Sequence, residues 1–266
     1  MNGPGTSPAS RLPKKPSRIK HYLTFILIVW MVWGSAVATD STFRELFTGL
    51  PEMWKLIDEM FPPNWRYFDN VVPAMLDTIR MAIAGTTFGA IIAIPFAVIS
   101  ASNIVKSPWI LYPARFVLNL IRTIPDLLLA ALFVAIFGLG LMPGVLALAV
   151  FSIGLIAKLT YEATETIDPG PLEAMTSVGA NRIQRIVFGV VPQVAAHYVS
   201  YVLYTFEINV RAAAVLGLVG AGGIGLYYEK TLGFLEYDKT NSIILFTLAV
   251  VLLIDFISTK LREKLL

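Results

Sequence analysis

Apolar and polar residues along the chain are separated into long blocks. Most of the apolar blocks approach the roughly 20 residues that a helix needs to cross a hydrocarbon core of about 30 Å. The third and fourth blocks are shorter, with only an LMPG turn between them. The blocks cover residues 21–38, about 78–101, 127–140, 144–157, from about 187 onward, and 241–258. This pattern predicts an all-α, polytopic membrane protein with about six transmembrane helices.

The N-terminal quarter of the chain divides into three parts. Residues 1–20 are rich in Pro, Ser, Lys and Arg and are predicted to be a basic tail, followed by the first transmembrane helix at 21–38. A basic stretch before an apolar one, with Ala36-Val37-Ala38 after it, is also typical of a cleaved signal peptide. Because this apolar stretch is longer than a usual signal and more spans follow, we favour an uncleaved helix. Residues 39–74 are polar and aromatic, which predicts an external segment, and 75–266 form the membrane-embedded core.

Composition agrees with a bilayer environment and excludes several chemistries. The 266 residues are 56% hydrophobic and 15% charged, and the mean hydropathy is +0.69, whereas soluble domains carry about 25% charged residues. The chain has no cysteine and only two histidines, His21 and His197. Disulfides, thiolate nucleophiles and an HExxH metal site are therefore excluded, and we predict neither catalytic nor metal-binding residues.

The distribution of basic residues predicts the orientation in the membrane. With the N-terminus inside, 14 of the 21 Lys and Arg residues fall in inside segments, which include Arg115 and Arg122. Inside loops carry the excess of Lys and Arg in membrane proteins. Both termini and the insert at 158–186 are therefore predicted to be cytoplasmic.

That insert contains an unusually polar and ordered stretch at residues 171–190. A turn at Asp168-Pro169-Gly170-Pro171 precedes it, and Glu173 suits the positive end of a helix. As one helix, the stretch would carry an apolar stripe opposite its polar residues. The stripe comprises Leu172, Met175, Gly179, Ile183, Ile186 and Val190. Periodicity alone is equally typical of an amphipathic helix lying on the membrane surface.

The same stretch resembles a motif of one transporter family. In the permease subunits of ATP-binding-cassette importers, an EAA loop reads EAA, three residues, Gly, nine residues, then I-x-L-P. Here the corresponding residues are Glu173-Ala174-Met175, Gly179 and Gly189-Val190-Val191-Pro192, at the same spacing. Met175, Gly189 and Val191 replace the family's Ala, Ile and Leu, which changes size and not polarity.

The resemblance extends from about residue 75 to the end and implies a mechanism without covalent chemistry. The loop at about 162–186 would be the coupling helix that sits in a cleft of a cytoplasmic ATPase dimer. Two such clefts imply a homodimer of this chain in a bacterial inner membrane, and an extracytoplasmic binding protein would deliver the substrate. The chain would bind no cofactor and no nucleic acid, only membrane lipid, while the ATPase uses ATP and Mg. The coupling residues would be Glu173, Ala174, Met175, Gly179, Ala180 and Arg182.

A glycine run at residues 218–225 invites a second interpretation. Its Gly220, Gly222 and Gly225 satisfy the G-x-G-x-x-G pattern of dinucleotide-binding proteins, but no β-α-β alternation surrounds it and no GK[ST] follows. Glycines at membrane depth instead allow close helix packing or irregular backbone beside a cavity. The wider segment YTFEINVRAAAVLGLVGAGGIG, with Pro192-Gln193, resembles the phosphonate branch of the importer permeases. That resemblance implies an organophosphonate or a related phosphorus oxyanion as substrate.

Candidate pathway residues lie beside this run, near the expected outer end of the fifth span. Glu207 and Arg211 are four residues apart, so they are expected either to form an ion pair on one helix face or to leave Arg211 free to attract the oxyanion. Arg122 and Asp126 flank Pro125, and for Arg122 we expect cytoplasmic anchoring. The hypothetical pathway or gate comprises Arg211, Glu207, Asn209, Gly217, Gly220, Gly222 and Gly223.

Two other classes of protein are less consistent with the sequence. An ion-driven secondary transporter predicts internal repeats and interrupted spans with buried acids, and no convincing repeat is present. A membrane enzyme would need His, Asp, Ser or metal ligands clustered at one membrane face, and the two histidines are far apart.

Overall fold

The computed structural model describes residues 18–39 and 43–265, and every regular element in them is helical. The chain separates into two units, Met1–Ile57 and Asp58–Leu266. Most of the expected basic tail lies outside the described residues. The first unit contains α1 (Ile19–Ala38), which buries no residue within the protein, and most of α2 (Phe43–Met60).

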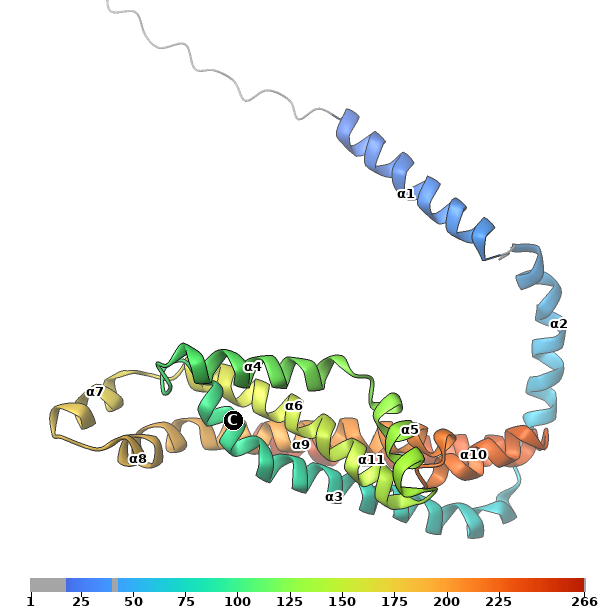
Figure 1. The fold of residues 1–266 in the computed structure, drawn as a ribbon. Helices are drawn as coiled ribbons and strands as arrows, with labels where there is room; N and C mark the ends of the chain where they lie inside the picture. The colour runs from blue at the N-terminus through green and yellow to red at the C-terminus, as the bar shows by residue number, and fades with distance from the viewer. Residues whose placement is uncertain (1–17, 40–42, 266) are drawn as a thin grey trace, which may run out of the picture. The chain divides into compact units, whose positions relative to one another are not determined.

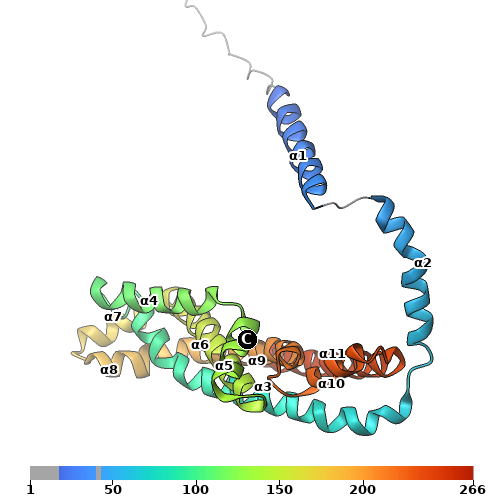
Figure 2. The same ribbon diagram turned by 45° about the vertical axis from the view of Figure 1, so that its right-hand side comes forward.

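The second unit forms a helical bundle (Figures 1 and 2). Its longest helices, α3, α6, α9 and α11, run along the bundle, while α7 and α8 lie at one end and α10 lies at the other. We call these the α7 end and the α10 end. Its elements are η1 (Trp65–Tyr67), α3 (Phe68–Ser100), α4 (Pro108–Thr123), α5 (Asp126–Phe137), α6 (Leu141–Glu165), α7 (Gly170–Ser177), α8 (Arg182–Gln184), η2 (Arg185–Val190), α9 (Val191–Leu216), η3 (Gly217–Val219), α10 (Ile224–Gly233) and α11 (Tyr237–Leu265).

Six membrane crossings are consistent with the described helices, as the sequence predicts. Five are long and apolar enough individually, and α4 with α5 gives a sixth, bent by 87° at its break. The helices do not coincide with the predicted spans. The helix α4, which begins at Pro108, precedes the apolar stretch expected to form the third span alone, α6 extends from Leu141 to Glu165, and α3 begins at Phe68, inside the segment expected to be external.

The error at α4 has a physical cause. Arg115, Asn119 and Arg122 interrupt its apolar sequence, so α4 contains no continuous apolar block of spanning length, although Ala114 and Leu118 are buried in the bundle. The helix ends before Ile124-Pro125, because a proline disfavours helical geometry in the residue before it. A sliding count of apolar residues therefore detects only α5.

Glycines on α3 and α6 allow these two helices to pack closely. A Cβ atom on Gly89 would lie 2.3 Å from the Cβ of Ser152, and one on Gly85 would lie 2.6 Å from the Cβ of Leu148. Small residues permit such close approach between membrane helices, where van der Waals contact and not water exclusion drives association. The core of the bundle therefore forms around α3 and α6, with α9 against both.

Candidate functional site

The loop between α6 and α9, which contains the EAA-like residues, is built from two short helices. The side chain of Asp168 accepts a hydrogen bond from the Gly170 N–H (2.9 Å), and Pro171 occupies the first turn of α7. The helix ends before Gly179, whose φ of 82° lies in the left-handed region that glycine adopts most easily. The N–H of Ala180 then bonds the carbonyl of Met175 (2.9 Å), which closes the helix end.

A new helix start follows directly. The Asn181 side chain accepts from the Gln184 N–H (2.9 Å), and the Gln184 side chain accepts from the Asn181 N–H (2.8 Å), which forms a capping box. The chain then passes through the π-helical turns of η2 into α9. The prediction of one helix over 171–190 was therefore wrong, and residues 162–165 of the expected coupling segment belong to α6.

The inner side of this loop packs on the start of α9. A Cβ atom on Gly189 would lie 3.0 Å from Leu172 Cδ2 and 3.3 Å from Met175 Sδ, so glycine here leaves room for both side chains. The Gln193 side-chain amide donates to the carbonyl of Gly189 (2.8 Å), and its oxygen accepts from the Asp168 N–H (3.1 Å). These contacts attach the loop to α9 at two points.

The outer side of the loop is exposed. It carries Glu173, Ala174, Gly179 and Arg182, while Met175 and Ala180 are partly buried. Three large apolar residues also face outward: Val178 is 84% exposed, Ile183 72% and Phe188 70%. The predicted stripe is therefore divided, because the turn at Gly179 moves Ile183 away from Leu172 and Met175. We call these seven exposed residues the loop surface: Glu173, Ala174, Val178, Gly179, Arg182, Ile183 and Phe188.

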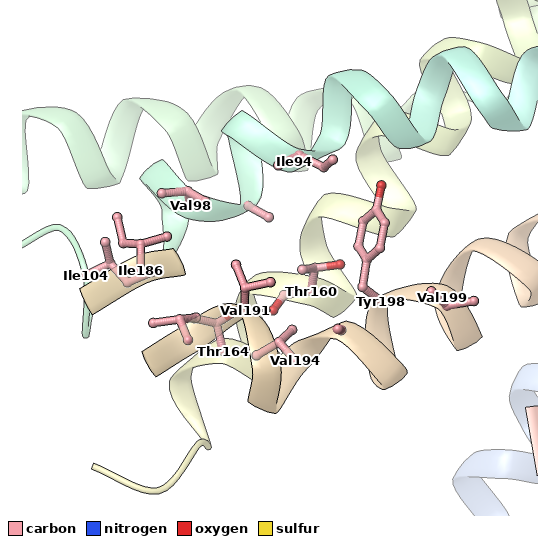
Figure 3. A pocket seen from close by; sticks show the side chains of 13 residues that line it. Ile94, Val98, Ile104, Thr160, Thr164, Ile186, Val191, Val194, Tyr198 and Val199 are labelled. Atoms are coloured by element: carbon pink, nitrogen blue, oxygen red, sulfur yellow. Dashed lines mark hydrogen bonds between the residues drawn. The ribbon is translucent and has the colours of Figure 1, made fainter. Parts of the chain in front are cut away.

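An apolar pocket lies beside the loop, between α3, α6 and α9 (Figure 3). Its volume is about 210 Å³, and Val98, Ile186 and Val194 line it together with Thr160. Tyr198 reaches across from α9, and its hydroxyl donates to the carbonyl of Ala90 on α3 (2.8 Å). Nearly all of the lining is aliphatic, so the pocket offers no arrangement of groups for catalysis or for binding an anion.

The glycine run forms a compact turn at the α10 end. Gly220, Gly222 and Gly223 have φ values of 84°, 84° and 71°. The carbonyl of Gly220 accepts from the Gly140 N–H (3.1 Å), and Thr78 Oγ1 accepts from the Ile224 N–H (2.8 Å). All residues from 220 to 225 are buried, so this part of the run is packed within the protomer.

The polar residues of α9 also lie in separate surroundings. Asn209 is fully buried, and its side-chain amide donates to Thr86 Oγ1 and to Ser152 Oγ, both at 2.7 Å. Arg211 and Glu207 form the ion pair that their spacing predicts, at 2.5 Å. The second oxygen of Glu207 accepts from Arg262 on α11 (2.9 Å), a partner that the sequence analysis did not identify.

The structure thus brings together some of the predicted site residues and separates others. The expected coupling residues share one exposed loop. The expected pathway residues fall into three places: the core at Asn209, the α9–α11 ion pairs at Glu207 and Arg211, and the buried glycine turn. Sequence reasoning missed Val178 and Phe188 on the loop surface, although both interrupt the otherwise polar side of the supposed helix.

This bundle of membrane-spanning helices, with a structured loop at one end, defines an integral membrane transport subunit of the type I importer fold. A solved structure with this fold is an inward-facing MetNI methionine ABC transporter, at a TM-score of 0.67 and 22% identity over 76% of this chain and 99% of that one. Residues 93–265 match the family described as the inner membrane component of binding-protein-dependent transport systems. The chain belongs to that family and is a multi-pass inner-membrane protein.

Two relatives from Stutzerimonas stutzeri cover most of the chain. A putative phosphite transport system permease protein, HtxC, is 36% identical over 94% of this chain and 88% of its own length. The phosphite transport system permease protein PtxC is 37% identical over 91% and 86%. A phosphate-import permease protein, PhnE, of Mycolicibacterium smegmatis is 36% identical over 87% of this chain and 44% of its own length.

Proposed function

We propose that this chain is the permease of an ATP-driven importer that carries a phosphorus oxyanion, such as phosphite or a phosphonate, across the inner membrane. The observation that carries the proposal is the naming of its relatives: those covering most of the chain are permeases for phosphite or phosphate. A carnitine transport permease of Listeria monocytogenes is 32% identical over only 60% of this chain. The phosphite and phosphate permeases match more of the chain, at higher identity, than the carnitine permease does, which favours a phosphorus oxyanion as the substrate.

In this proposal the loop surface contacts a cytoplasmic ATPase. Exposed apolar side chains next to charged ones are typical of a protein interface, and Val178, Ile183 and Phe188 would bury their area there. The α7 end would then be cytoplasmic and the α10 end would face the binding protein. One loop surface per chain supports a homodimer above two ATPase subunits.

Growth on a single phosphorus source tests the substrate class. The chain, its ATPase and its binding protein would be expressed in cells that lack phosphite and phosphonate uptake but can metabolise both compounds. We expect growth on phosphite or methylphosphonate, and uptake of radiolabelled methylphosphonate or loss of phosphite from the medium. Cells expressing the ATPase and the binding protein without this chain are the control.

Carnitine uptake by the same cells is the competing outcome. Uptake of carnitine without uptake of any phosphorus oxyanion would replace the proposed substrate class while leaving the importer function intact. Uptake that persists when the ATPase is replaced by a variant unable to hydrolyse ATP would contradict the importer function itself.

A further inference from the structure

We propose that Arg122 binds the transported oxyanion midway across the membrane, on a water-facing side of α4; this inference rests on the proposed function. Arg122 lies in the last turn of α4, immediately before the break between α4 and α5. Irregular backbone at membrane depth is tolerated only where it is buried in protein or lines a water-filled cavity. Ile124 and Pro125 at the break are exposed in the protomer, so the break is not buried within this chain.

The depth of Arg122 follows from two fixed points. Arg115, two turns earlier on α4, donates to the carbonyl of Ser100 (2.9 Å) and to the carboxylate of Glu165, which are the last residues of α3 and α6. At 1.5 Å per residue, Arg122 lies roughly 10 Å further along its own helix, and Gly154, which it contacts, lies roughly 16 Å from Glu165. Half of a 30 Å hydrocarbon core is about 15 Å, so Arg122 lies close to its middle.

The side chain of Arg122 is accommodated by a glycine. A Cβ atom on Gly154 would lie 2.8 Å from Arg122 Cγ and 3.0 Å from a methyl carbon of Ile121. The aliphatic stem of the arginine thus lies over α6 where α6 has no side chain, while the residue as a whole remains exposed in the protomer. The contact with Gly154 therefore gives the stem of Arg122 a defined place on α6.

Like the exposed cations Lys106 and Arg182, Arg122 has no anionic partner among the described residues, which distinguishes it from four cations within the long helices. Arg80, Lys158, Arg211 and Arg262 each have a carboxylate oxygen within 3.2 Å. Within residues 18–39 and 43–265, no carboxylate oxygen lies within 4.0 Å of Arg122. The nearest acid along the chain, Asp126, accepts from the Leu127 N–H at the start of α5 (2.9 Å). An unpaired charge at this depth is costly unless it faces water or a ligand.

The exposed side of α4 combines polar and apolar residues. Tyr112, Asn119 and Thr123 recur at helical spacing and are all exposed, and Thr123 Oγ1 donates to the carbonyl of Asn119 (2.8 Å). Phe116 lies on the same side and is 67% exposed, so the polar groups nearest to Arg122 along the helix are Asn119 and Thr123. A guanidinium beside hydroxyl and amide groups suits a tetrahedral phosphorus oxyanion, which accepts several charge-assisted hydrogen bonds.

Thiol labelling tests the water-facing side without assuming a substrate. Thr123→Cys is introduced into the full chain, which has no native cysteine, in complex with its ATPase and binding protein in proteoliposomes. We expect reaction with hydrophilic methanethiosulfonates, and none at Leu118→Cys, which is buried on the side of α4 that packs in the bundle. In water, a unit charge about 7 Å away changes the reaction rate of a charged reagent about threefold. Arg122 should therefore make the anionic methanethiosulfonate react about threefold faster and the cationic one about threefold more slowly. Arg122→Gln in the same background should remove that preference.

Uptake of methylphosphonate or phosphite tests the ligand. Arg122→Gln should lower the maximal uptake rate at least about tenfold, as expected when a charged hydrogen-bonding partner is lost. Arg122→Lys should lie between Gln and the unaltered chain, while the half-saturating concentration, set by the binding protein, stays unchanged. Lys106→Gln, which removes an exposed cation from the preceding loop, is the matched control and should transport normally.

The outcomes separate the two proposals. Unreactive Thr123→Cys, a charge preference that survives Arg122→Gln, or normal uptake by Arg122→Gln would each overturn the role of Arg122. If the charge preference depends on Arg122 but the unaltered complex imports no phosphorus oxyanion, the anion-attracting position stands and the proposed substrate class fails.

Discussion

Replacement of Gly217 by alanine should destabilise the protein through a contact between two backbones. A Cβ atom at this position would lie 2.5 Å from the Cα of Gly225 and 2.6 Å from the carbonyl oxygen of Gly222. Non-bonded carbon atoms prefer about 3.5–4.0 Å, so the two segments would have to separate by roughly 1 Å. No flexible side chain is present to yield, since the nearest atoms all belong to the backbone.

Overpacking of this kind costs about 1–3 kcal/mol, and the rigidity of the contact places Gly217→Ala at the upper end. The change in helix propensity returns at most about 1 kcal/mol, which leaves a net loss of about 2 kcal/mol. For a protein of this size the midpoint of thermal unfolding should fall by about 4–8 °C. The measurement is the apparent midpoint of the purified chain in detergent, followed by fluorescence.

Gly233→Ala is the matched control for this prediction. Gly233 is also a glycine of this C-terminal region, but nothing lies within 4 Å of the position that its Cβ would occupy. We expect its midpoint to equal that of the unaltered chain or to rise slightly. Equal midpoints for Gly217→Ala and Gly233→Ala would refute the reasoning, because they would show that the glycine turn tolerates separation at no cost.

Three further predictions concern coupling, ion pairing and topology. Glu173→Lys should abolish transport and the stimulation of ATP hydrolysis by loaded binding protein while the chain remains in the membrane; normal stimulation would contradict the assignment of the loop surface. Arg211→Gln should lower the thermal midpoint little, because Glu207 keeps Arg262, whereas Glu207→Gln leaves two arginines unpaired and should lower membrane abundance and the midpoint clearly; equal effects would show that the second pair is unimportant. In intact cells an impermeant thiol reagent should label Leu235→Cys, which is 67% exposed at the α10 end, and not Asn181→Cys; the reverse result would invert the proposed topology.

Much of the fold could be predicted because a bilayer simplifies the rules. Blocks of apolar residues specify crossings regardless of tertiary contacts, and the count of about six agrees with the described helices. The bounds near α4 could not be obtained in this way. Polar residues interrupt the apolar sequence of α4, and its packing against α6 is visible only in the structure.

The candidate site could be predicted where a sequence motif located it, and less well where residues were chosen by their charge or polarity alone. The spacing of Glu173 and Gly179 located the loop, but the positive φ of Gly179 was invisible to a periodicity argument that treated glycine as a weak helix former. Arg122 was interpreted as an anchor because its depth depends on contacts with Gly154 that no local pattern reveals. Conversely, Asn209 and residues 220–225 of the glycine run were expected to line a pathway and are buried by long-range packing.

The helix α9 runs without a break between the two ends of the bundle. Its 26 residues span roughly 39 Å, from Gln193, which is bonded to the loop at Asp168, to Leu216, next to the tightly packed contact of Gly217. An unbroken helix is stiff along its axis, so a displacement applied at one end reaches the other nearly undiminished. The π-helical turns of η2 are wider than α-helical ones and directly precede α9. One continuous segment of the chain thus combines irregular turns beside the loop with a regular helix that extends to the other end of the bundle.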